Sequence, residues 1–217
     1  MILPLIQIVF LRHGNTFEST ETPVQIGSKT DLSLTLKGQE QAQKIAGYLT
    51  ENKLIPDHIY TGPLKRHLET ADILANHFIN APVIPAPALN ELDYGQWEGK
   101  SIDAISTQWP KAYQAWCEQA IWPIGIFGDQ ANLFSHQTAL KNWLDDLSCN
   151  TEPTSTILAI TSNGLLKILL TLIPDLALTL FENHRFDQYK VKTGHFCLIE
   201  YNILNKKLSI KKWNISI

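Results

Sequence analysis

Two short, almost continuously apolar runs constrain the fold of this chain more than any other feature. Residues 6–11 (IQIVFL) and 156–161 (TILAIT) are as long as typical strands and show no alternation of polar and apolar positions. Strands of parallel sheets show this pattern, because helices cover both of their faces and bury both sets of side chains. The two runs therefore predict strands of a parallel sheet with helices on either side.

Segments of helical and strand-like character alternate between and beyond these runs. Thr35, a favourable N-cap residue, predicts the start of a helix that runs to about residue 52. A second helix is expected after the turn at residues 61–63, with an inner face made of Leu64, Leu68, Ala71, Leu74 and Phe78. Shorter strands are expected at 57–60 and 82–84, and an antiparallel pair at 196–201 and 208–213.

The remaining apolar segments complete the expected architecture. Residues 101–147 predict helices with a break at 123–128, and an apolar helix is expected to begin at Asn163 and stop before Pro174. Strands that alternate with helices indicate a three-layer α/β/α sandwich with a mostly parallel central sheet. We expect a single domain over residues 1–217, with a helical insertion at about 100–150.

Charge and composition exclude several function classes. The 217 residues carry 18 Lys and Arg against 21 Asp and Glu, a net charge of -3, which argues against a nucleic-acid binder. No apolar run has the length of a membrane span, and the three cysteines are too widely spaced to indicate a disulfide framework or a zinc site. Because Pro4 interrupts the apolar N-terminus and no cation precedes it, we predict a strand rather than a signal peptide, and a cytoplasmic protein.

Polar residues follow the predicted strands, where ligands bind in open α/β sheets. Arg12, His13 and Asn15 follow the first strand, Arg66 lies just after the second, and Glu91 and Asn163 follow later ones. Arg12 and Arg66 are two of the chain's three arginines, and the planar guanidinium group binds tetrahedral oxyanions with two parallel hydrogen bonds. Helix N-termini near Pro63 and Gly164 would add N–H donors. This combination predicts a phosphate site.

Four ordered motifs resemble those of the histidine phosphatase (phosphoglycerate mutase-like) superfamily. Residues 11–16 (LRHGNT) are similar to its R-H-G-x-T, and residues 31–42 (DLSLTLKGQEQA) to its D-x-P-L-T-x-x-G-x-x-Q-A. Residues 60–71 (YTGPLKRHLETA) and 89–99 (LNELDYGQWEG) resemble its S-x-L-x-R-x-x-x-T-A and L-x-E...G-x-W-E-G. The run E-R-H-Y-G, typical of mutases, is missing after Glu91, so the resemblance is to the phosphatase branch.

The resemblance implies a role for each site residue. His13 would attack phosphorus and form a phosphohistidine, and Glu91 would protonate the leaving group. Arg12, Arg66 and Asn15 would bind the non-bridging oxygens of a small phosphorylated substrate. No metal and no cofactor is implied, because cationic side chains take the place of a magnesium ion. The oligomeric state, the natural substrate and the role of the aromatic-rich 100–150 region stay open.

Asn163 is the main departure from the family pattern. The segment Ser162-Asn163-Gly164-Leu165 stands where the family has S-H-G-G, and no G-E-S segment is recognisable near residues 125–130. Asparagine can donate a hydrogen bond to the phosphoryl group, but it carries no charge. The sequence therefore predicts a phosphomonoester hydrolase slowed by Asn163. The alternative is a weak or inactive pseudoenzyme that binds a phosphorylated ligand.

Overall fold

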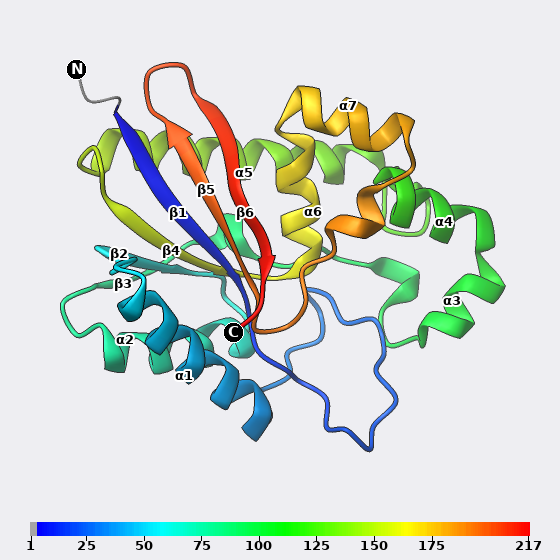
Figure 1. The fold of residues 1–217 in the computed structure, drawn as a ribbon. Helices are drawn as coiled ribbons and strands as arrows, with labels where there is room; N and C mark the ends of the chain where they lie inside the picture. Colours follow the sequence, from blue (N-terminus) through cyan, green and yellow to red (C-terminus); the bar gives the residue numbers. More distant parts are fainter. Residues whose placement is uncertain (1–3) are drawn as a thin grey trace.

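A computed structural model describes residues 4–217, which contain one six-stranded sheet (Figure 1). Its strands are β1 (Leu5–Arg12), β2 (His58–Thr61), β3 (Val83–Pro85), β4 (Thr156–Thr161), β5 (Phe196–Asn202) and β6 (Lys207–Ile215), in the order β3-β2-β4-β1-β5-β6. The first four of this order run parallel, whereas β5 is antiparallel to β1 and β6 is antiparallel to β5. The mostly parallel sheet expected from the sequence is confirmed.

Alternate side chains of β1 enter two separate apolar cores. Ile6, Ile8 and Phe10 pack on one face of the sheet with α5 (Gln130–Asn150) and α6 (Asn163–Thr171). Val9 and Leu11 pack on the other face with α1 (Leu36–Glu51) and α2 (Lys65–His77). Since successive residues of a strand point to opposite faces, an uninterrupted apolar strand requires both covering layers. The three-layer sandwich is therefore confirmed (Figure 1).

The other helices lie at the side of the sandwich (Figure 1). They are α3 (Ile102–Gln108), α4 (Pro110–Gln119) and α7 (Pro174–Glu182), with short 3-10 turns η1 (Pro87–Leu89), η2 (Gly95–Trp97) and η3 (Phe186–Tyr189). Within residues 4–217, no single helix is long and apolar enough to span a membrane. α6 and α7 reach that length and hydropathy only when taken together, and the two helices are bent by 105° relative to each other.

Most expected elements are found within a few residues of their predicted bounds, and the differences have physical reasons. The helix expected to stop before Pro174 does so, but Pro174 then occupies the first turn of α7, a position where proline is tolerated. Leu68 was expected on the inner face of α2 and is 40% exposed. The buried face of α2 instead carries the polar residues Arg66, His67 and Thr70, because it lies against the functional end of the sheet.

The region expected to be a helical insertion divides into two structural parts. α3 and α4 contribute to a separate aromatic cluster around Trp97 and Trp116. α5, in contrast, buries Leu140, Trp143 and Leu144 against the sheet. α5 is thus a component of the sandwich, whereas α3, α4 and the segment that follows them lie outside its layers.

Two glycines allow α1 to approach the loop after β1. A Cβ atom on Gly14 would lie 2.3 Å from the Gly38 carbonyl oxygen, and one on Gly38 would lie 2.3 Å from the Asn15 carbonyl oxygen. Thr35 caps α1, since its hydroxyl accepts a hydrogen bond from the Gly38 N–H at 3.1 Å. The two motifs that contain these glycines are therefore the two sides of one backbone contact, which fixes the loop that carries His13.

Candidate active site

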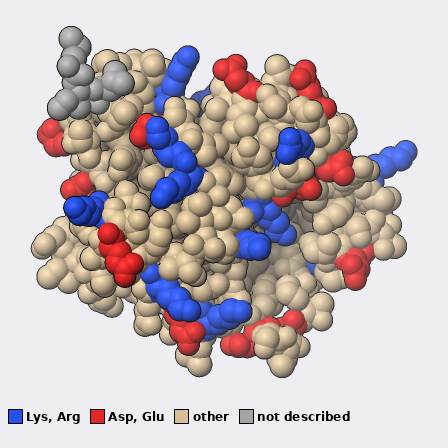
Figure 2. All heavy atoms as spheres, viewed as in Figure 1, with Lys and Arg blue, Asp and Glu red and all other residues tan. Residues whose placement is uncertain are grey.

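A cavity of about 1120 Å³ opens at the carboxyl ends of β1 and β4. Its inner end is lined by Arg12, His13, Asn15, Glu91 and Asn163. The outer part is lined by aromatic and charged side chains, among them Phe17, Trp97, Tyr113, Trp116, Lys167 and Lys190. Figure 2 shows a hollow in the molecular surface with Lys and Arg side chains beside it. Five of the six predicted site residues thus lie on the wall of one cavity.

His13 is held as a neutral imidazole with one free nitrogen. Its side chain is buried, and Nδ1 lies 2.8 Å from the Gly14 carbonyl oxygen. Because a carbonyl only accepts, Nδ1 carries the proton and donates, which leaves the Nε2 lone pair available. Burial, reinforced by the positive charges of Arg12 and Arg66, lowers the pKa of His13 well below its usual value. This is the protonation state that a nucleophilic histidine needs.

The segment at residues 191–194 holds three site residues in place. Arg12 Nη1 donates to the Val191 carbonyl at 2.6 Å, and the Thr193 hydroxyl donates to the Asn15 carboxamide oxygen. The Asn163 carboxamide oxygen accepts from the Val191 N–H at 2.9 Å. With their oxygens occupied, Asn15 and Asn163 each have an NH₂ group left to donate. Both carboxamides are thus oriented as hydrogen-bond donors at the cavity.

Arg66 lies behind the cavity wall and is fully buried. Nη1 donates to the Thr30 carbonyl at 2.7 Å and Nη2 to the Gly27 carbonyl at 3.0 Å, so three of its five N–H groups are left. Burial is the main cause of its lowered pKa, and the largest opposing effect comes from the charge of Glu91. Arg66 belongs to the same charge cluster as the other site residues, although it does not line the cavity.

A carboxylate holds the loop that binds Arg66. Glu98 Oε1 accepts from the Gly27 N–H at 2.9 Å and from the Thr30 hydroxyl at 2.7 Å. These are the two residues whose carbonyls bind the Arg66 guanidinium. Sequence reasoning placed Glu98 in a motif but gave it no role, since its partners are far from it along the chain.

Glu91 is a buried carboxyl group against the start of α6. Oε1 accepts from the Leu92 N–H at 2.8 Å and Oε2 from the Gly164 N–H at 3.3 Å. Burial raises the pKa of Glu91, opposed by these N–H groups and by Arg66. A Cβ atom on Gly164 would lie 2.2 Å from Glu91 Oε1 and 2.3 Å from the Tyr94 hydroxyl oxygen. Gly164 is therefore the residue that allows this carboxyl group to reach the helix.

Two further polar residues near the site were missed by the sequence analysis. Tyr94 lines the cavity, and burial together with the Glu91 charge raises its pKa well above the usual value. The His67 ring lies 5.6 Å from that of His13, centroid to centroid, and its Nε2 is 2.7 Å from the Ser162 hydroxyl oxygen. Burial lowers the pKa of His67 to about 3, so it is neutral. Tyr94 could have been identified from its place three residues after Glu91, whereas no pattern identifies His67.

Metal ligands are not clustered in the described part of the chain. Among residues 4–217, no group of three or more His, Cys, Asp or Glu side chains is arranged to hold a metal ion. The polar groups at the inner end of the cavity are instead the Arg12 cation and hydrogen-bond donors beside one carboxyl group, with the Arg66 cation behind the wall, an arrangement suited to an oxyanion.

Comparisons with known proteins identify the family and the fold. The family model of the histidine phosphatase superfamily (branch 1) matches residues 8–216. The chain belongs to this superfamily. A structure of a mycobacterial glucosyl-3-phosphoglycerate phosphatase is similar, with a TM-score of 0.78 and 20% identity over 98% of this chain and 100% of the other. A structure of YhfR from Bacillus stearothermophilus has a TM-score of 0.75 and 22% identity over 98% of each chain.

Each of the curated relatives matches about half of this chain. Phosphoglycerate mutase-like protein 4 of Arabidopsis thaliana is 34% identical over 50% of this chain and 46% of the relative. Phosphoserine phosphatase 1 of Hydrogenobacter thermophilus is 30% identical over 53% of this chain and 52% of the relative. The matched region spans about half the length of these relatives. Both phosphatases and mutase-like proteins are therefore among the chain's relatives.

Proposed function

We propose that this protein is a metal-independent phosphomonoester hydrolase that works through a phosphohistidine on His13. The observation that carries the proposal is the hydrogen bond from His13 Nδ1 to the Gly14 carbonyl, which leaves Nε2 free inside a cluster of cations. A neutral imidazole whose other nitrogen is oriented by a hydrogen bond is a competent nucleophile near pH 7.

The two steps of the reaction use His13 and Glu91 in turn. First, Nε2 attacks phosphorus, the bond between phosphorus and the ester oxygen breaks, and the Glu91 carboxyl group gives its proton to the leaving oxygen. Water then attacks the phosphohistidine, the phosphorus–nitrogen bond breaks, and the Glu91 carboxylate takes the proton from water. The raised pKa of Glu91, caused by burial, suits a carboxyl group that acts as an acid.

The remaining site residues bind the transferring phosphoryl group. Arg12 and Arg66 neutralise its negative charge, and the NH₂ groups of Asn15 and Asn163 donate to its oxygens. Asn163 donates without a charge, where the family pattern has a histidine. Complete loss of a preorganised donor to the transition state lowers the rate by about 10²–10³-fold, so the missing charge at position 163 is expected to slow the reaction. A small phosphorylated substrate and a cytoplasmic location stay predictions from the sequence.

The second candidate is a phosphate-binding protein without turnover, and Asn163 is the observation that favours it. Arg12, Arg66 and Asn15 would still bind a phosphorylated ligand. A mutase is disfavoured, because the loop after Glu91 lacks the mutase run.

Phosphate release from phenyl phosphate, measured with and without EDTA, tests the proposal. We expect slow release that depends on His13 and is unchanged by EDTA. Inhibition by the chelator that a divalent metal reverses would contradict the mechanism. Stabilisation by inorganic phosphate in a thermal-shift assay, without any release from phenyl phosphate, would favour the binding protein.

A further inference from the structure

His67 is a buried histidine beside the nucleophile, and the proposed reaction gives it no role. It lies on α2, directly after Arg66, and is fully buried. Because burial lowers its pKa to about 3, the ring is neutral and supplies no charge to the phosphoryl group. Nε2 lies 2.7 Å from the Ser162 hydroxyl oxygen, whereas Nδ1 has no hydrogen-bond partner among the described residues. The polar contact of this ring is thus made with Ser162.

Ser162 occupies the N-cap position of α6 but does not cap the helix. A serine at this position usually accepts a hydrogen bond from the N–H of the second or third helical residue, here Gly164 or Leu165. Within residues 4–217, the Ser162 side chain makes no such bond, although its backbone is extended as in other N-cap residues. Its hydroxyl group is bonded to His67 instead. The first turn of α6 therefore lacks the acceptor that its N-cap residue would ordinarily supply.

The Glu91 carboxyl group supplies this acceptor. Oε2 accepts from the Gly164 N–H at 3.3 Å, while Oε1 accepts from the Leu92 N–H at 2.8 Å. A Ser162 hydroxyl turned toward the helix would compete with the carboxyl group for the N–H groups of the first turn. Because the hydroxyl is bonded to His67, the Gly164 N–H is left for Glu91.

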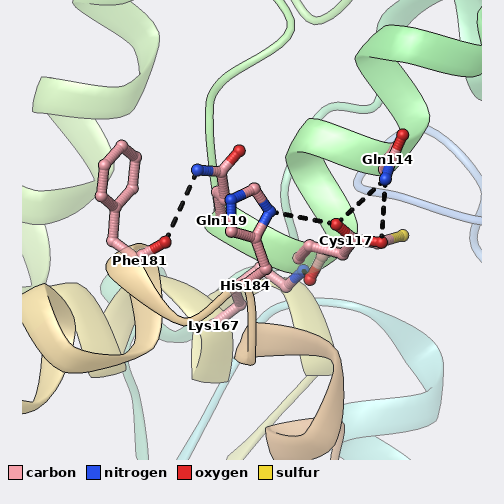
Figure 3. A network of polar contacts seen from close by, with 7 residues as sticks. Gln114, Cys117, Gln119, Lys167, Phe181 and His184 are labelled. Carbon is pink, nitrogen blue, oxygen red and sulfur yellow. Dashed lines mark hydrogen bonds and ion pairs between the residues drawn. The ribbon is translucent and has the colours of Figure 1, made fainter.

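A second contact fixes the position of α6, so a change at His67 would act locally. Lys167, one turn after the start of the helix, donates from Nζ to the Trp116 carbonyl at 2.7 Å and to the Cys117 carbonyl at 3.1 Å. Figure 3 shows the Lys167 side chain beside Cys117, between α6 and α4. Buried leucines of α6 also pack in the apolar core. Loss of the His67 hydrogen bond should therefore free the Ser162 hydroxyl without moving the helix.

We propose that His67 is a positioning residue. It holds the Ser162 hydroxyl away from the first turn of α6, and so leaves the Gly164 N–H to orient the Glu91 carboxyl group. This inference rests on the proposed function, in which Glu91 gives its proton to the leaving oxygen. Proton transfer requires the acid to lie within hydrogen-bond reach of that oxygen, so the orientation of the carboxyl group affects the rate.

The hydrogen bond from Gly164 also affects the ionisation of Glu91. An N–H donor stabilises the carboxylate, so this bond lowers the pKa of Glu91 against the larger effect of burial. The charged groups that face the carboxyl group are Arg12 of β1 and Arg66 of α2, and Tyr94 lies on the same loop. None of these groups is altered in the experiment below. Loss of the bond from Gly164 should therefore raise the pKa of Glu91 further.

The experiment compares the parent protein with His67→Leu, Ser162→Ala and the double variant, which together form a double-mutant cycle. His67→Leu removes the nitrogen that binds Ser162, and Ser162→Ala removes the hydroxyl that could then cap α6. His67→Gln is the matched control, because its carboxamide can bind the same hydroxyl. For each protein, kcat/KM is measured on phenyl phosphate and on 4-nitrophenyl phosphate as a function of pH, with thermal unfolding as the control for folding.

We expect His67→Leu to lower kcat/KM for phenyl phosphate about tenfold, because phenolate needs the proton of Glu91. The value for 4-nitrophenyl phosphate should stay within about twofold, because nitrophenolate leaves without a proton. The fall of kcat/KM at high pH should move upward by about one pH unit. Ser162→Ala in the same protein should reverse both effects, since no hydroxyl is left to compete, and His67→Gln should stay close to the parent.

Three results would overturn the inference. The first is an unchanged rate and pH profile in His67→Leu. The second is an equal loss on the two substrates, which would show that His67 acts through its packing beside the His13 ring. The third is a loss that Ser162→Ala does not reverse, because a purely structural role of His67 does not depend on the serine hydroxyl.

Failure of the inference and failure of the proposed function give different results. If the parent hydrolyses neither phosphate, the hydrolase proposal fails, and the state of Glu91 is then followed directly. The same proteins, isotopically labelled at the glutamate carboxyl carbons, are titrated by NMR, and Glu91→Gln identifies the Glu91 signal. A higher titration midpoint in His67→Leu that Ser162→Ala reverses supports the role of His67, and an unchanged midpoint contradicts it.

Discussion

The inner and outer ends of the cavity are built in different ways. At the inner end, His13 and Glu91 are 3% and 5% exposed, and each is hydrogen-bonded to backbone at the carboxyl ends of the sheet. At the outer end, the wall comes from residues 16–26, which form no helix, and from α3 and α4, where Ile102 is 40% exposed. Buried backbone contacts fix geometry, whereas exposed loops tolerate change.

This contrast separates the chemistry of the site from its choice of substrate. Substitutions at the inner end should lower activity on all phosphomonoesters by a similar factor, because every substrate places its phosphoryl group there. Substitutions at the outer end should change the ratio between substrates, because only the leaving alcohol reaches it. Experiments on the inner end can therefore use a simple aryl phosphate.

Removal of the nucleophile should have the largest effect. His13→Ala is expected to lower kcat/KM for phenyl phosphate by a factor on the order of 10⁴ or more, since the covalent step is lost. The measurement is phosphate release by parent and variant, with thermal unfolding as the control for folding. Full activity in a folded His13→Ala protein would show that His13 is not the nucleophile.

Loss of the Glu98 carboxylate, which holds the loop that binds Arg66, should have the next largest effect. Glu98→Ala leaves the Gly27 N–H and the Thr30 hydroxyl without their acceptor. The loop that orients Arg66 would then shift, and a displacement of about 1 Å in a positioning group can cost about 10²-fold in kcat/KM.

Glu98→Gln is the matched control for this prediction. Its carboxamide oxygen can accept both hydrogen bonds, and the Glu98 oxygen that the NH₂ group replaces has no partner among the described residues. Glu98→Gln should therefore stay within a few-fold of the parent, in both kcat and the affinity for inorganic phosphate. If both variants are equally slow, the hydrogen bonds of Glu98 do not explain its role.

Replacement of Asn163 should raise activity. Asn163→His adds a charge-assisted hydrogen bond to the phosphoryl group, and we expect kcat/KM for phenyl phosphate to increase by about 10–10². The increase should fade above the pKa of the new imidazole, because only its protonated form carries the charge. No increase in a folded, phosphate-binding variant would favour the binding protein without turnover.

The pH dependence of the parent should be the smallest effect. Because burial lowers the pKa of His13 well below its usual value, the nucleophile stays neutral at a lower pH than a free imidazole would, and protonation of His13 should cause no fall in kcat/KM near pH 6.5. Burial raises the pKa of Glu91, so kcat/KM should fall as the pH rises through that pKa and the acid form is lost. The phosphate group of the substrate also ionises near pH 6, so its titration is measured separately and the kcat/KM profile is corrected for it. A rise in activity with a midpoint near pH 6.5 would contradict this assignment.

The inner end could be predicted from the sequence to a large extent, and the outer end could not. His13 directly follows the apolar strand β1 and Asn163 comes two residues after the apolar strand β4, so the parallel sheet brings them to one edge. The contacts of the 191–194 segment with Arg12, Asn15 and Asn163 leave no such pattern, because backbone groups make most of them. Lys167 was also missed, since its partners are carbonyls of a helix whose packing the sequence does not specify.

The most direct test of the account is the chemical state of His13 during turnover. The parent protein is mixed with a phosphomonoester labelled at phosphorus, denatured within milliseconds, and analysed by peptide mass spectrometry for an acid-labile phosphoryl group. We predict label on the peptide that contains His13, and no label in His13→Ala. Release of labelled phosphate without any labelled peptide, or label on a residue other than His13, would contradict the phosphohistidine mechanism.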